Sequence, residues 1–190
     1  MKTFVISLVL LLSCMCLTAQ YEYEASPKHP FGKLNPKAPA SVGDYAPLIG
    51  SCACESVSRN KDGEWAAPVK MNWTFTYIMN GTAVQDKTLK ADGGHSGSIR
   101  QYDSEKGLWY VHYYSTSPSA TLQSWEGKKN EDGDIILYNE QTAPNGMEGF
   151  YKITFSNISE KGFEWLGAWV NLDDTFSHPL WKISCKKIKL

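Results

Sequence analysis

Arginine is scarce in this sequence of 190 residues, and so are long apolar runs and helical periodicity. Only Arg59 and Arg100 occur, and the lysines are spread along the chain as solvated surface charge usually is. The formal net charge is -1, and no basic stripe is present. Nucleic acid is therefore not an expected partner, and neither is an anionic membrane. Beyond the first residues no apolar run approaches the length of about 20 residues that a membrane-spanning helix needs.

Motifs that announce catalysis or cofactor binding are also missing. The sequence contains no P-loop, no Rossmann fingerprint, no Gly-x-Ser-x-Gly elbow and no Cys-x-x-Cys-His haem attachment. The four histidines, His29, His95, His112 and His178, are not spaced as a metal-binding pair. We therefore expect no cofactor and no metal ion.

The first residues predict a signal peptide over residues 1–20. A basic start at Lys2 precedes an apolar run over 4–12, and the stretch that follows ends in a small residue, Ala19. A membrane anchor is one alternative, but the run is too short to span a bilayer comfortably. Lipidation at Cys14 is another, but the apolar run continues beyond it. We expect cleavage after Ala19 or Gln20, which would leave a secreted or periplasmic protein with a net charge of about -2.

Cleavage would leave three cysteines, Cys52, Cys54 and Cys185. In an oxidising compartment this number suggests one disulfide and one thiol. Cys52 and Cys54 share one face of an extended segment, so they could pair with each other only under strain. We expect Cys185 to be bridged to one of the two, which would join the first strand to the last. A Cys-x-Cys metal site is the alternative, but no histidine pair lies nearby in sequence.

The segment 71–84 is the most regular of the chain and predicts a hairpin. Large side chains at Trp73, Phe75, Tyr77 and Met79 alternate with small polar ones, which is the pattern of a strand with one buried face. Asn80-Gly81 then suits a type I′ turn, because both residues accept positive φ. The chain is expected to return antiparallel from residue 82 to residue 89.

The remaining segments repeat this pattern of strand, turn and strand. About ten short strands are expected, with turn signals every 8 to 12 residues or so, and no sustained helical periodicity is present. The short connections favour a single antiparallel up-and-down β-barrel with about 8–10 strands over residues 48–190. Residues 21–47 hold five of the nine prolines and predict an extended, poorly ordered Pro-rich linker.

Several short motifs of the predicted strands are familiar from one known family. They are Leu48-Ile49-Gly50, Trp73, the run from Tyr77 to Asp86, the run from Ile99 to Asp103, Trp109, Phe155-Ser156-Asn157-Ile158, Phe163-Glu164-Trp165 and Trp181. Together they resemble the DUF1579 proteins, which are lipocalin-like barrels of the calycin type. The resemblance covers roughly residues 48–188 and implies a closed antiparallel barrel with an internal cavity, without implying an activity.

The sequence departs from such barrels at the start of the first strand. Lipocalin-like barrels commonly begin with Gly-x-Trp, whose Trp plugs the barrel base against a basic residue of the last strand. Here Gly50-Ser51 is followed by Cys52, and the last strand offers Cys185 followed by Lys186. Our hypothesis is that a disulfide replaces this plug.

Arg100 and His112 are the leading candidates for a site. Arg100 lies within a strand, and a buried arginine needs a carboxylate, for which Glu148 and Glu164 are possible partners, or an anionic ligand. His112 shares a strand face with Tyr114, although a hydrogen-bonded structural histidine is the ordinary alternative. The aromatic rings could line a cavity or fill the barrel. The predicted ligand-binding set is Trp73, Tyr77, Arg100, His112, Tyr114 and Trp165.

Two functions of different classes follow from this set. The first is a secreted lipocalin-like barrel that binds a small apolar or amphipathic molecule in its interior. The second is a barrel enzyme that acts on such a molecule, using His112 with a carboxylate and Arg100. The sequence favours binding, because no residue pair indicates catalysis. The sequence does not indicate an oligomeric state.

Overall fold

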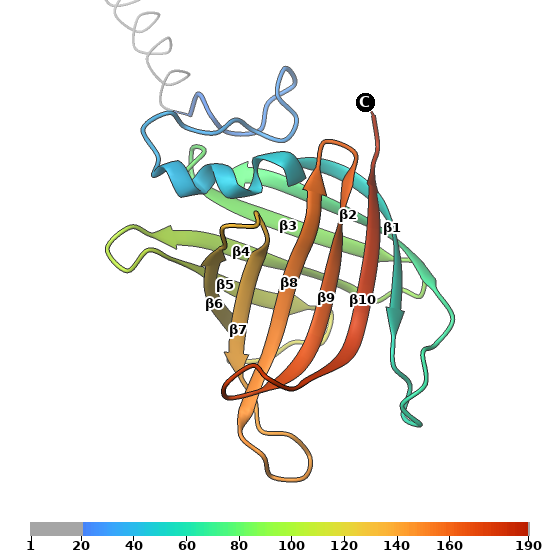
Figure 1. Cartoon of the computed structure of the whole chain (residues 1–190). Coiled ribbons are helices and arrows are strands. Elements are labelled where there is room, and N and C mark those ends of the chain that lie inside the picture. Colours follow the sequence, from blue (N-terminus) through green and yellow to red (C-terminus); the bar gives the residue numbers. More distant parts are fainter. Residues whose placement is uncertain (1–20, 190) are drawn as a thin grey trace, which may run out of the picture.

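The computed structural model describes residues 21–189, and within them ten antiparallel strands close into one barrel (Figure 1). Each strand pairs with its neighbours in sequence, and β1 also pairs with β10, so the described barrel has no free edge. The predicted all-β up-and-down barrel is confirmed, whereas the predicted signal peptide lies outside the described residues. The strands are β1 (Gly50–Ser58), β2 (Val69–Ile78), β3 (Ala83–Lys90), β4 (His95–Asp103), β5 (Leu108–Ser115), β6 (Gln123–Lys129), β7 (Ile135–Glu140), β8 (Gly149–Ser159), β9 (Gly162–Asn171) and β10 (Ser177–Lys187).

The alternation in β2 sets which side chains enter the barrel. Trp73, Phe75 and Tyr77 are buried, and polar residues between them face outward. Met79 does not continue this face, because it lies in the turn and is half exposed. Asn80 and Gly81 both have positive φ, as the sequence predicts, and Met79 shares this conformation, so three left-handed residues reverse the chain.

One end of the barrel is covered by η1 (Ala40–Leu48), a 3₁₀ helix that lies across the top in Figure 1. The sequence predicts an extended linker here, but Val42, Tyr45 and Leu48 are fully buried instead. Their spacing of three places them on one side of a 3₁₀ helix, which has three residues per turn. The helix is too short for its three-residue period to stand out in the sequence.

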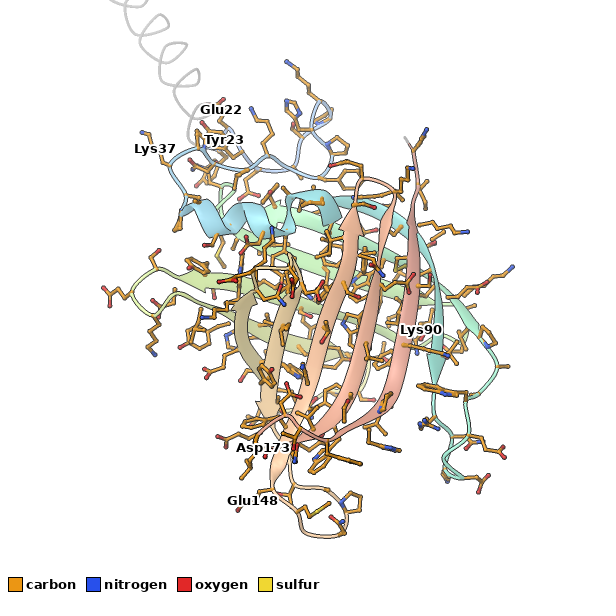
Figure 2. The ribbon with its side chains drawn as sticks, in the orientation of Figure 1. Glu22, Tyr23, Lys37, Lys90, Glu148 and Asp173 are labelled. Carbon is orange, nitrogen blue, oxygen red and sulfur yellow. A yellow bond between two sulfur atoms is a disulfide. The ribbon has the colours of Figure 1, made fainter. Side chains whose placement is uncertain are left out.

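The segment before η1 is also held against the barrel. The Tyr77 amide donates to the Phe31 carbonyl oxygen (2.9 Å), and the Tyr23 amide donates to Asn80 Oδ1 (3.0 Å). Residues 21–48 therefore act as a lid over the end at which the β2–β3 turn lies. Tyr23 lies on this side of the molecule in Figure 2.

A disulfide joins Cys54 to Cys185, which are paired in register across β1 and β10. This confirms the expected bridge between first and last strands and decides which cysteine forms it. Cys52 remains a free, buried thiol. The disulfide does not fill the base of the barrel. That end is filled by η1, whose Tyr45 ring packs edge-on against Trp109, with ring centroids 4.8 Å apart.

Candidate functional site

The half of the barrel away from η1 contains a cavity of about 280 Å³. Seven of its twenty lining residues are aromatic, among them Trp73 from β2, Trp125 from β6 and Trp165 from β9. Gln123 and Gln141 belong to its lining and are exposed to solvent, so the cavity opens at this end. The barrel interior is therefore filled at the η1 end and hollow at the other.

A buried ion pair lies in the cavity wall. Arg100 of β4 contacts Asp86 of β3 through its Nη1 atom, and the two side chains are 4% and 2% exposed. Asp86 Oδ1 also accepts a hydrogen bond from Trp73 Nε1 (2.9 Å). Burial of both charges is tolerable because each has an opposite charge in contact.

The carboxylate partner of Arg100 differs from the two that the sequence suggests. Glu164 is exposed on the outer face of β9, where it accepts a hydrogen bond from Ser184 Oγ (2.8 Å). Glu148 is exposed in the β7–β8 loop, at the bottom of Figure 2. Asp86 is the partner because β3 and β4 pair with Asp86 opposite Ser98. Arg100 follows Ser98 by two residues on the same inward face of β4, so its side chain lies next to Asp86.

Three aromatic rings surround the Arg100 guanidinium. Its Cζ atom lies 5.2 Å from the ring centre of Tyr45, 5.3 Å from Phe75 and 5.7 Å from Phe155. Burial lowers the pKa of Arg100, while the nearby Tyr45 raises it. Arg100 Nε has no hydrogen-bond partner among the described residues. An acceptor atom from an occupant of the cavity would satisfy such a donor.

The other predicted site residues are divided among three places. Trp73 and Trp165 line the cavity together with Arg100. Tyr77 points inward, but it lies at the end covered by η1 and does not line the cavity. His112 and Tyr114 belong to the outer face of β5.

The outward direction of His112 and Tyr114 corrects the sequence-based expectation that both face inward. Val111 and Tyr113 line the cavity, and successive residues of a strand face opposite sides of a sheet. The Tyr114 hydroxyl accepts a hydrogen bond from Gln85 Nε2 (3.0 Å) on the outside of the barrel. Its ring lies over Gly97, where a side chain would collide with it.

Sequence reasoning missed Asp86, Tyr113 and Tyr151 as lining residues. Asp86 lies within a segment that was identified as a strand, so its spacing from Val84 and Thr88 could have indicated an inward carboxylate. Tyr113 and Tyr151 approach each other from β5 and β8, which no local pattern reveals. Within residues 21–189 no three His, Cys, Asp or Glu side chains are grouped as metal ligands.

The buried Tyr77 and the half-buried Tyr151 should make stability fall at high pH. Burial raises the pKa of Tyr77 and of Tyr151 to about 12 from a usual value of 10.0, with Tyr113 adding to the effect at Tyr151. The unfolded chain loses these protons first, so the free energy of unfolding should decrease between about pH 10 and pH 12. Urea denaturation across this range should show a smaller decrease for Tyr77→Phe and for Tyr151→Phe. An unchanged decrease in both variants would contradict the assignment.

The fold and the cavity define a lipocalin-like β-barrel. No family model matches the chain, and no curated protein sequence matches it. The structure is similar to the crystal structure of Rv2717c from M. tuberculosis, with a TM-score of 0.54 and 12% sequence identity over 80% of this chain and 100% of that chain. It is also similar to the S-type phycobiliprotein lyase CPES from Guillardia theta, with a TM-score of 0.48 and 10% identity over 77% and 91% of the two chains.

At these identities the similarity concerns the fold alone. The similarity to CPES is too weak to support an argument. The barrel class is thus established, and the resemblance to DUF1579 rests on the short motifs in the sequence.

Proposed function

We propose that this protein is a DUF1579-like barrel that binds one small amphipathic molecule in its cavity. The observation that carries the proposal is the combination of an aromatic wall with a buried Arg100 whose Nε lacks a partner. Binding sites for small molecules are typically apolar and contain a few placed polar groups. The volume of about 280 Å³ lies just below the usual range of roughly 300–1,000 Å³. The occupant is accordingly small.

The enzymatic alternative has less support. It requires His112 and a carboxylate at one open cavity, and His112 is on the outer face of β5. A general base must come within hydrogen-bond distance of the proton that it removes. Among the lining residues that the structure describes, Asp86 is the one carboxylate, and it is engaged by Arg100 and Trp73.

We also propose that the protein acts after export, in an oxidising compartment. The Cys54–Cys185 disulfide supports this, because such bonds persist mainly outside the reducing cytosol. N-terminal sequencing of the exported protein should find a start at Gln20 or Tyr21. Detection of Met1 or of acylated Cys14 would contradict the proposal. In the described part of the chain, no helix has the length and apolar character required to cross a bilayer.

Filling the cavity should prevent binding. Ser98 is buried in the cavity wall and makes no side-chain hydrogen bond with another described residue, so Ser98→Phe adds volume there with little other loss. We expect the fluorescent probe N-phenyl-1-naphthylamine to bind the wild-type protein. We expect at least tenfold weaker binding to the variant, because overpacking leaves no room for it. Probe fluorescence and quenching of the cavity tryptophans report the affinity.

The matched control is His112→Ala, a change on the outer face that should leave the affinity unaltered. Ser98→Leu provides a smaller increase in volume if the phenylalanine variant fails to fold. Unchanged probe binding by a folded Ser98→Phe variant would contradict the cavity as the site. Native mass spectrometry of protein purified from its own host would then be used to detect a retained small molecule.

A further inference from the structure

Lys90 is the last residue of β3, at the end of that strand away from η1, and it is not itself one of the residues that line the cavity. Lys90 is paired in register with Met71. Two residues further along both strands, towards the interior of the barrel, Thr88 is paired with Trp73. Met71, Trp73 and Thr88 all line the cavity, so alternation places Lys90 on the same side of the sheet. Lys90 is half-buried, whereas its neighbour Leu89 is exposed.

The Lys90 ammonium contacts an aromatic ring of the cavity wall. Its Nζ atom lies 4.9 Å from the ring centre of Trp181, which lines the cavity and donates a hydrogen bond to Ser56 Oγ (2.8 Å). In Figure 2, Lys90 appears between β10 and β1, below the level of η1. This contact holds the charged group close to the entrance.

Lys90 forms no salt bridge among residues 21–189. Asp92 lies in the following turn, where its Oδ1 atom accepts a hydrogen bond from the Gly94 amide (3.0 Å). Among the described residues that line the cavity, only Arg100 and Asp86 are charged, and they form a pair. The charges of the cavity wall itself therefore cancel, and the Lys90 ammonium lies beside this wall without a salt-bridge partner among the described residues.

We infer that the occupant is an anionic amphiphile whose carboxylate, sulfonate or phosphate group is bound by Lys90 at the mouth. This inference rests on the proposed function and adds the charge and orientation of the molecule. An anionic group deep in the cavity would lose its hydration and would lie close to the Asp86 carboxylate, so Arg100 is not available as its counter-ion. At the mouth the same group keeps part of its hydration, while its apolar body extends inward along the aromatic wall.

Decanoate and decanol provide a test, because they share one alkyl chain and differ in charge. Each is used to displace N-phenyl-1-naphthylamine from the full-length protein. We expect Lys90→Met to weaken displacement by decanoate about threefold to fivefold, as is usual for a partly exposed ion pair. Displacement by decanol should be unchanged, and Lys90→Arg should retain most of the affinity for decanoate. Added salt should weaken decanoate binding to the wild-type protein only.

Lys70→Met is the matched control, since Lys70 is exposed on the outer face of β2, opposite Glu55 in register. It removes one lysine charge without changing the mouth and should leave both displacements unaltered. Equal effects of Lys90→Met on decanoate and decanol, or none on either, would overturn the assignment of Lys90 while leaving cavity binding intact. Failure of the wild-type protein to bind either alkyl compound or the probe would overturn the proposed function as well.

Discussion

Replacing Arg100 with methionine should lower the free energy of unfolding by about 3–5 kcal/mol, the usual cost of breaking a buried ion pair from one side. The variant leaves the Asp86 carboxylate buried with only the Trp73 indole as a partner. It also removes the cation from among three aromatic rings. Urea denaturation monitored by tryptophan fluorescence measures the loss.

A double-mutant cycle separates the ion pair from the packing of its two side chains. Asp86→Leu combined with Arg100→Met removes both charges and should be less destabilising than the sum of the single changes, because neither charge is left unpaired. Additive losses would mean that the pair contributes through volume alone. A loss below about 1 kcal/mol for Arg100→Met would contradict the burial of the pair.

Removing the Cys54–Cys185 disulfide is the second change with a large expected effect. The bridge spans a sequence separation of 131 residues, so it strongly restricts the unfolded chain. We expect the variant with alanine at both positions to lose about 2–5 kcal/mol of stability. Urea denaturation under oxidising conditions measures it, and the midpoint should shift to lower urea concentration.

Cys52→Ala is the control for this change. It removes a buried thiol from the same strand without affecting the bridge, so its cost should be limited to a small loss of packing. Reduction of the wild-type protein should reproduce the loss seen in the double variant and should have no effect on that variant. Equal stability of the double variant and the wild-type protein would contradict a stabilising role for the bridge.

The sequence by itself determined the fold class and the main strands. In residues 71–77 the large apolar side chains alternate with small polar ones, and this contrast indicates both the strand and its buried face. The position of Cys185 near the end of the chain likewise indicated a bridge to the first strand. Local pattern was sufficient here because each feature depends on residues close together in sequence or on the closure of the barrel.

The tertiary structure alone decided which residues meet inside the barrel. In β5 both faces carry aromatic rings, so alternation gave no contrast to show that Val111 and Tyr113 face the cavity while His112 and Tyr114 face outward. The pairing of Arg100 with Asp86 depends on the register between β3 and β4, which no single strand encodes.

The same limit applies to η1 and to the cavity. Val42, Tyr45 and Leu48 are buried because the barrel offers them an apolar end to cover, and this requires the strands to be in place first. Whether the aromatic rings fill the barrel or line a space depends on the sum of side-chain volumes within a closed sheet. That sum is a property of the assembled barrel, so the hollow beside Lys90 and Trp181 could be recognised only in three dimensions.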